Sequence, residues 1–332
     1  MRCYHDVKSK QKVIPMKRQL LQRFLISFMS LAVSTLLLAY DFEVDGIYYS
    51  INQEDKTTVS VTYRDRKFDC YSGSVQIPTT VTYNGQEYLV TCIDSEAFEL
   101  CPNLTSVTIP ESITHICSYA FSGSYSLTSI VIPNSVTKID GGVFYACSGL
   151  RSVRLPNGLT TISASAFREC TQLTSVNIPN SVTSINTYAF RNCNKLESIT
   201  IPSSVTDIGN YAFQYCINLK EVYCMAKQVP NTNTNAFDGD YLESITLYVP
   251  EAAIEDYKAT APWSNFPTIK KSYVVGDVNG NGEVEIGDVT SVLTLMATPE
   301  ASGYINRAAD ANGNGEIEIG DVTTILSIMA GE

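Results

Sequence analysis

The sequence predicts a β-rich solenoid followed by a small all-α domain. Phenylalanines recur every 23 residues along the middle of the chain, and prolines recur at the same interval. Two later segments of 21 residues, beginning at Asp277 and Asp310, are identical at 15 positions. Self-similarity at a fixed period is the signature of a repeat architecture. The repeating residues are Phe98, Phe121, Phe144, Phe167, Phe190 and Phe213, with Pro110, Pro133, Pro156, Pro179 and Pro202.

Each 23-residue unit approximates the pattern LTSVxIPxSVTxIxxxAFxxCxx. Its aliphatic positions, such as Leu127, Ile130 and Ile132, alternate as in one short strand with a buried face. Proline ends that strand because it has no amide to donate to a ladder. The Ala-Phe pair predicts a tight helical turn whose Phe fills the coil. One coil cannot bury its own apolar face, so neighbouring coils must stack.

The N-terminus has the features of an export signal. Lys17, Arg18 and Arg23 precede an apolar run from Phe24 to Ala39, which has the length of a signal peptide and is short for a spanning helix. We therefore expect a secreted or cell-surface protein. The alternative is a retained membrane anchor.

The rest of the chain divides by composition. Asn84-Gly85 is a strong hairpin signal, and a short helix is expected over Ala252–Lys258, with Trp263 sealing the last coil. The predicted parts are a signal peptide (1–39), an N-terminal β cap (40–90), the repeat solenoid (91–249), a C-terminal cap and linker (250–272), and the small domain (273–332).

The chain has ten cysteines, five of which follow a repeat's Phe by three residues. Cysteine packs like a small hydrophobe and is usually buried. Ser124 fills the same slot in one unit, so small size is the requirement there. We expect a reduced cysteine ladder in the core. Disulfides between coils are the alternative, whereas metal binding by this ladder is disfavoured because no His accompanies it.

Residues between the buried strand positions should point outward. One outward column is mostly Ser, and the next is varied by Arg154, Asn177 and Tyr223, which are our candidates for ligand contacts. The alternative is that these Ser and Thr residues merely solvate a sheet of high β-propensity.

Catalysis finds little support in the sequence. His115 falls in a variable column of the repeat, and the pattern places no Cys or Asp arrangement beside it. No phosphate loop or zinc-protease motif is present. The net charge is −11, of which residues 1–39 contribute +6, so the exported chain is more acidic still. This balance argues against nucleic acid and anionic membranes as partners. We expect no catalytic residues and no enzyme.

The duplicated segments each begin with a twelve-residue calcium-loop pattern. Oxygen ligands occupy positions one, three, five, nine and twelve, the backbone carbonyl of position seven adds another, and Gly282 and Gly315 allow the sharp turn at position six. Two Ca²⁺ ions are predicted. Their ligands are Asp277, Asn279, Asn281, Glu283, Glu285 and Asp288 in the first loop, and Asp310, Asn312, Asn314, Glu316, Glu318 and Asp321 in the second.

An apolar helix is expected after each loop, and Val284 and Ile317 should pair the two loops. The helical positions are Val289, Val292, Leu293 and Met296, then Val322, Ile325, Leu326 and Met329. A module of fewer than 60 residues has a small core and needs additional stabilisation, such as bound metal ions, to fold.

Residues 91–250 resemble the BspA-like class of bacterial leucine-rich-repeat surface proteins, and residues 274–332 resemble a type I dockerin. The first resemblance implies adhesion to a host or microbial surface protein or glycan. The second implies docking to a cohesin on another protein, through loop positions ten and eleven and the helices. Those positions hold Ile286, Gly287, Ile319 and Gly320. Many dockerins carry Ser or Thr there, and the two similar halves would permit docking in two orientations.

The main hypothesis is therefore an exported, non-catalytic binding or adhesion protein attached to an assembly through a calcium-loaded dockerin. The alternative is a structural spacer subunit of an extracellular polysaccharide-degrading complex. A third hypothesis, an enzyme subunit, lacks a catalytic domain in the sequence.

Overall fold

The computed structural model describes residues 40–64, 71–237, 242–272, 276, 284, 286–297, 311 and 319–330. The predicted signal peptide lies outside the described residues. Within the described part of the chain, no helix combines the length and apolarity needed to cross a membrane.

An N-terminal β cap precedes the repeats. Its hairpin turns at Asn84 and Gly85, which both have positive φ, at 51° and 78°. Two positive φ values suit the type I′ turn of a two-residue hairpin, so the hairpin prediction is confirmed. β3 pairs in parallel with β6, which joins the cap to the first coils. The cap strands are β1 (Phe42–Val44), β2 (Ile47–Ile51), β3 (Thr58–Thr62), β5 (Thr80–Tyr83) and β6 (Gln86–Ile93).

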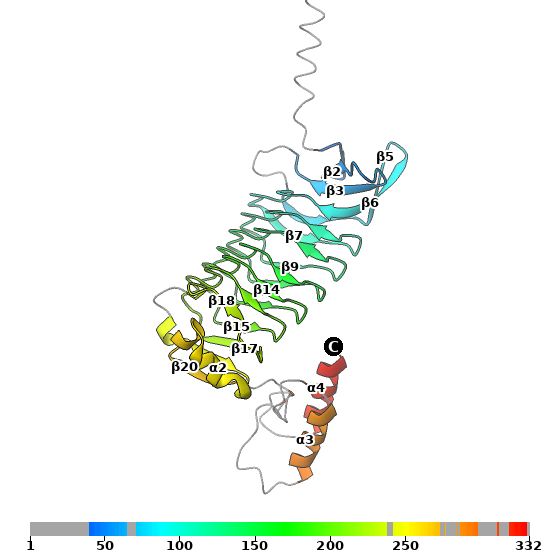
Figure 1. The fold of residues 1–332 in the computed structure, drawn as a ribbon. Helices are drawn as coiled ribbons and strands as arrows, with labels where there is room; N and C mark the ends of the chain where they lie inside the picture. The colour runs from blue at the N-terminus through cyan, green and yellow to red at the C-terminus, as the bar shows by residue number, and fades with distance from the viewer. Residues whose placement is uncertain are drawn as a thin grey trace, which may run out of the picture.

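The coils stack into a solenoid with strands on two sides (Figure 1). In the middle of the first set, Val153 lies opposite Ile130 on one neighbour and Val176 on the other, so the register there is 23 residues per coil. This set contains β4 (Gly73–Gln76), β7 (Leu104–Thr108), β9 (Ser129–Val131), β11 (Ser152–Arg154), β13 (Ser175–Asn177), β15 (Ser198–Ile201), β17 (Glu221–Cys224), β19 (Thr246–Val249) and β20 (Thr268–Lys271).

A second set of two-residue strands was not expected. It forms where the sequence shows the second apolar pair of each unit, such as Val136 and Ile139, both of which are buried. These strands also pair in parallel, at 23-residue register except between β16 and β18, where Asp207 lies opposite Asn231. They are β8 (His115–Ile116), β10 (Lys138–Ile139), β12 (Thr161–Ile162), β14 (Ser184–Ile185), β16 (Asp207–Ile208) and β18 (Asn231–Thr232).

The predicted helical turn at each Ala-Phe pair is wrong for the described coils, which have hydrogen-bonded turns there. A helix needs each amide for the carbonyl four residues earlier. Here the amide of Phe144 donates instead to the carbonyl of Ala166 in the next coil, at 2.9 Å. Residues with positive φ, such as Tyr188 at 61° and Asn192 at 62°, also interrupt any helical run.

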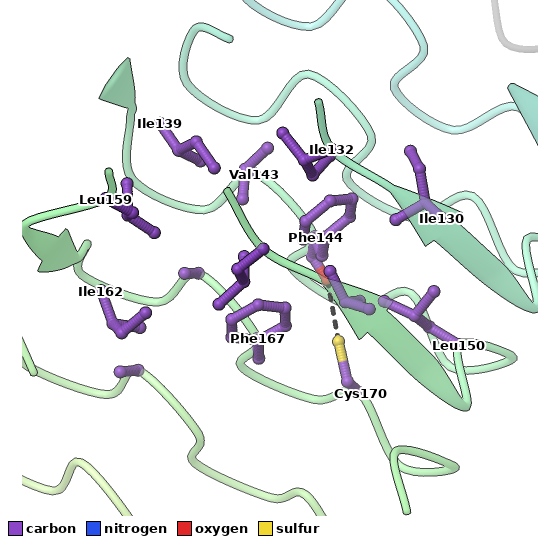
Figure 2. Packing of buried hydrophobic residues seen from close by; sticks show 14 of the residues in the cluster. Ile130, Ile132, Ile139, Val143, Phe144, Leu150, Leu159, Ile162, Phe167 and Cys170 are labelled. Carbon is purple, nitrogen blue, oxygen red and sulfur yellow. Dashed lines mark hydrogen bonds between the residues drawn. The ribbon is translucent and has the colours of Figure 1, made fainter. Parts of the chain in front are cut away.

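A column of stacked phenylalanines forms the centre of the solenoid, and Figure 2 shows two of them, Phe144 and Phe167. From Phe98 to Phe237, successive ring centroids lie 5.0 to 5.5 Å apart. All of these rings are buried. Since each ring packs on the coil before and after it, the core is continuous along the solenoid axis.

The last coil is closed by a C-terminal cap. Trp263 is fully buried and lies 5.4 Å from Phe237, centroid to centroid. The hydroxyl of buried Tyr257 donates to the carbonyl of Ala226 at 2.9 Å. The predicted short helix and tryptophan seal are both confirmed. The elements here are η1 (Leu242–Ser244), η2 (Glu251–Ala253), α2 (Ile254–Ala259) and η3 (Trp263–Asn265).

The described part of the small domain contains helices α3 (Ile286–Ala297) and α4 (Ile319–Ala330). Their contact is a separate apolar cluster of Val289, Val292, Val322 and Ile325, against which Val284 packs. Ile317, the expected partner of Val284, lies outside the described residues.

Candidate functional site

The cysteine ladder is structural and reduced. Cys170 donates its thiol hydrogen to the carbonyl of Phe144 in the preceding coil, at 3.1 Å (Figure 2). Ser124 makes the equivalent bond to Phe98 at 2.7 Å, which explains why Ser replaces Cys in that coil. Burial raises the pKa of the Cys147 thiol to about 12. These thiols are therefore protonated and unreactive at neutral pH. The same bond recurs at Cys147, Cys193 and Cys216.

The outward strand face is as predicted. Arg154 and Asn177 are exposed and lie directly opposite each other on β11 and β13. Ser129, Ser152 and Ser175 line the neighbouring column and are also exposed. Small hydroxyl residues therefore lie beside Arg154 on this part of the face.

Tyr223 lies farther along the same face and is half-buried. Its ring stacks on Tyr248 with centroids 4.6 Å apart, and its hydroxyl donates to the Glu221 carboxylate at 3.0 Å. The sequence did not reveal Tyr248, because an irregular coil between β17 and β19 breaks the 23-residue spacing. The register of β17 and β19, which sets Tyr223 opposite Tyr248, brings the two rings together.

A second surface was missed from the sequence. On the turn side of the solenoid, the Arg168 guanidinium lies over the rings of Tyr145 and Tyr188, at 5.2 and 5.4 Å. Arg191 lies over Tyr188 and Tyr215, at 5.3 and 5.5 Å. We call these five residues the tyrosine–arginine ridge. Tyr145, Arg168 and Arg191 share the column that directly follows the core Phe, whereas Tyr188 and Tyr215 lie in two nearby variable columns.

Asp288 and Asp321, at position twelve of the two predicted calcium loops, are fully buried in the first turns of α3 and α4. Burying a carboxylate is costly unless it is hydrogen-bonded or holds a cation. Two buried carboxylates at equivalent positions fit hard, oxygen-coordinated Ca²⁺. The other predicted ligands lie outside the described residues: Asp277, Asn279, Asn281, Glu283, Glu285, Asp310, Asn312, Asn314, Glu316 and Glu318.

Each helix of the small domain also exposes an apolar stripe. Ile286 is 64% exposed and Leu293 is 45% exposed. The equivalent residues of α4, Ile319 and Leu326, are 62% and 45% exposed. The spacing of seven residues places each pair on one helix face. Gly287 and Gly320 lie beside these stripes and accept hydroxyl hydrogen bonds from Ser291 and Thr324.

The expectation that His115 has no Cys or Asp beside it is wrong. Its Nε2 lies 2.8 Å from the Asp140 carboxylate, and its ring nitrogens lie 3.8 Å from Cys117 Sγ. Cys92 Sγ lies 3.5 Å from Cys117 Sγ. The hydrogen bond between the thiols lowers the pKa of Cys117 and raises that of Cys92. The second strand set, absent from the prediction, brings these residues together.

Comparison with known families agrees with both modules. The model of the BspA type leucine rich repeat region matches residues 68–196 and 142–258, in six copies. This match spans more than half of the chain, so the protein belongs to the BspA type leucine-rich-repeat family. The model of the dockerin type I domain matches residues 275–326. Both are non-catalytic binding modules. Dockerins bind calcium and dock to cohesins.

Solved structures include similar solenoids. The leucine-rich-repeat protein of T. pallidum is 27% identical, with 60% of this chain and 89% of that chain aligned and a TM-score of 0.52. A leucine-rich cell surface protein from Faecalibacterium prausnitzii is 22% identical, with coverage of 69% and 72% and a TM-score of 0.45. A leucine-rich-repeat protein from Bacteroides ovatus is 25% identical, with coverage of 70% and 77% and a TM-score of 0.37. No curated protein matches the chain.

Proposed function

We propose that this chain is an exported recognition protein, secreted or held at the cell surface. Its solenoid binds a protein or glycan, and its calcium-loaded dockerin module attaches it to a cohesin on another protein. The observation that supports this best is the duplication in the small domain. Each half has a buried aspartate at the end of a calcium loop and an exposed apolar stripe on the helix that follows.

Two Ca²⁺ ions would be held by the twelve loop residues predicted from the sequence. Asp288 and Asp321 support this assignment because their carboxylates are buried at the start of α3 and α4. Ligation there would fix each helix to its loop, so that calcium orders the stripe that meets the cohesin.

The cohesin would contact Ile286 and Gly287 in one half, or Ile319 and Gly320 in the other. Leu293 and Leu326 extend these contacts along the helices. The two stripes have nearly equal exposure at matching positions, so either half supports docking and the module binds in two orientations. Exposed apolar residues at the rim of a small module are typical of a binding surface.

The test is capture of cohesin-bearing proteins from the native cell surface, with and without a calcium chelator. Ile286→Asp with Leu293→Asp blocks one stripe, and Ile319→Asp with Leu326→Asp blocks the other. Each double variant should still bind, whereas the combination should lose binding by at least about tenfold. The control is Ile217→Asp, at an exposed solenoid position. Unchanged capture by the combined variant, or by chelated protein, would refute the docking role.

On the solenoid, we propose that the strand face around Arg154, Asn177 and Tyr223 contacts the ligand. Arg154→Ala and Tyr223→Ala should each weaken binding of the protein or glycan recovered by capture. Val131→Ala is the matched control, because Val131 is exposed in the same column opposite Arg154. If these variants bind normally while Tyr188→Ala on the tyrosine–arginine ridge does not, the ligand surface lies on the turn side.

The alternative is a spacer subunit of an extracellular polysaccharide-degrading complex. The uniform Ser column of the strand face favours it, because few side chains there distinguish one ligand from another. A spacer requires a functional dockerin module but no ligand contacts on the solenoid. Capture that depends on the dockerin stripes but not on any solenoid substitution would favour this function.

A further inference from the structure

A cluster of metal-ligating side chains lies where the N-terminal cap meets the first coils. Three parallel strands, β6, β8 and β10, run side by side there. Their alternate residues Ile93, Ile116 and Ile139 point into the core and are buried. Because side chains alternate along a strand, the residues on either side point outward. These outward residues include Cys92, His115, Cys117 and Asp140.

The distances within this cluster match those of a tetrahedral metal site. With Zn–S bonds of about 2.3 Å and Zn–N bonds of about 2.0 Å, ligand atoms lie about 3.8 Å apart for two sulfurs, and about 3.5 Å for sulfur and nitrogen. The observed separations are 3.5 Å between Cys92 Sγ and Cys117 Sγ, and 3.8 Å between Cys117 Sγ and His115 Nδ1. One atom from each of Cys92, His115 and Cys117 lies within 4.8 Å of the other two.

The histidine is oriented for this role. Its Nε2 lies 2.8 Å from Asp140 Oδ2, and Lys138 holds the other carboxylate oxygen at 3.2 Å. If Nε2–H donates to Asp140, the lone pair of Nδ1 is left for a metal. A carboxylate bound to the far nitrogen of a ligating His is the usual outer-shell partner in such sites.

A disulfide between the two thiols fits the register less well. Cys92 lies directly opposite His115, so Cys117 is two residues farther along the neighbouring strand. With strands about 4.8 Å apart and a rise of about 3.3 Å per residue, such diagonal positions have Cα atoms about 8 Å apart. Disulfides usually require Cα separations of about 4.4–6.8 Å. The diagonal suits two thiolates that share one ion better than two bonded sulfurs.

We propose that Cys92, His115 and Cys117 form a binding site for a thiolate-preferring divalent metal of the zinc class, with Asp140 as the residue that positions His115. All four side chains are half-buried, so the fourth coordination position faces solvent. The chemistry differs from that of the calcium loops, since soft sulfur ligands select zinc-like ions and carboxylates select calcium. The site also joins the cap to the first two coils.

The test uses the full chain, reduced and saturated with Ca²⁺ so that its carboxylate loops are filled. Zn²⁺ is titrated by calorimetry, and Co²⁺ is added as a spectroscopic probe. We expect one strong Zn²⁺ site and a sulfur-to-cobalt charge-transfer band. Cys92→Ser and Cys117→Ser should each remove the band. Asp140→Asn should keep it but weaken Zn²⁺ affinity by about 10–100-fold.

The matched control is Cys170→Ser, a thiol-to-hydroxyl change that Ser124 already represents in the same ladder. It should bind Zn²⁺ like the parent protein, and unchanged circular dichroism should show that each variant is folded. Absence of the cobalt band in the reduced parent protein would overturn the proposal. So would unaltered metal binding by the Cys92 and Cys117 variants, or a Cys92–Cys117 disulfide found by mass spectrometry in protein isolated without reductant.

Discussion

At the scale of the residue, the solenoid depends on two columns. The phenylalanines stack face to face through the centre, and beside them Ser124 and the cysteines from Cys147 to Cys216 each donate a hydrogen bond to a phenylalanine carbonyl one coil earlier. The phenylalanine rings are among the largest fully buried side chains, and aromatic rings contribute strongly to core packing. The small donor fits beside it and adds a second hydrogen bond to a carbonyl that already accepts one: Phe144, for example, also accepts the amide of Cys147.

Replacing Phe144 with Ala should destabilise the solenoid by about 3–5 kcal/mol, the usual cost of emptying a buried aromatic position. The ring is fully buried between Phe121 and Phe167, with centroids 5.5 Å away on both sides. Chemical unfolding followed by circular dichroism measures the change. The control, Ile217→Ala, removes a side chain that is 57% exposed and should cost less than about 0.5 kcal/mol.

The buried thiols predict a pH dependence. Burial raises the pKa of Cys147 and of Cys216 to about 12 in the folded state, against about 8.5 when unfolded. Their contribution to stability is complete below about pH 8.5 and is lost as the pH rises toward 12. The slope is about 1.4 kcal/mol per pH unit for each thiol.

Urea unfolding of the reduced protein at pH 8, 9 and 10 measures how steeply the free energy of unfolding falls with pH. The first value lies below the pH range in which the thiols ionise, and the other two lie within it. The variant Cys147→Ser with Cys216→Ser should lose stability less steeply, because its hydroxyls do not ionise in this range. An identical slope in parent and variant would rule out the buried thiols as the source.

At the scale of the element, each coil consists of two short strands and tight turns. The backbone amides bond mainly to the neighbouring coil, as Phe144 does to Ala166. Tertiary stacking therefore overrides the local preference of Ala-Phe for a helix. The close approach of coils also makes some positions sensitive to a single added carbon.

Gly149 is such a position, since a Cβ there would lie 2.0 Å from the backbone carbonyl oxygen of Tyr125 in the preceding coil. Gly149→Ala should cost about 1–3 kcal/mol, because a backbone atom of a stacked coil must move. Gly158→Ala is the matched control, because nothing lies within 4 Å of its added Cβ; it should be neutral or stabilise slightly. Thermal unfolding compares the two, and equal midpoints would contradict the close packing.

At the scale of the whole molecule, the described residues form two separate cores. One runs from the N-terminal cap through the coils to Trp263, and the other joins α3 to α4. Among the described residues, the second core has only four buried apolar side chains. So small a core rarely holds a module together without further support.

Removal of calcium should therefore unfold residues 274–332 and leave the solenoid folded. Differential scanning calorimetry with excess chelator should show the loss or lowering of one transition and no change in the other. The same module is also closely packed at Gly276, where an added Cβ would lie 3.0 Å from the Val284 side chain. A single calcium-independent transition would refute the assignment of the ion-stabilised module.

Much of this structure followed from periodicity. The 23-residue spacing predicted the register of the first strand set, the phenylalanine column and the outward positions of Arg154 and Asn177, because each coil repeats the same contacts. The tight turns were missed because hydrogen bonds between coils, which no local pattern reveals, replace those of a helix. The cluster at His115 was missed for a related reason: Cys92 and Asp140 each lie 25 residues from their partners Cys117 and His115, and only the unexpected second strand set makes them neighbours.

The uniform register has a consequence for how this molecule changes over generations. Each 23-residue coil presents an equivalent stacking surface to the coil before it and another to the coil after it. Loss or duplication of a 23-residue unit by slippage in the coding sequence would bring equivalent stacking surfaces together again and leave both end caps unaltered. The length of the strand face can thus vary by whole 23-residue units, while the two end caps still cover the ends of the solenoid core.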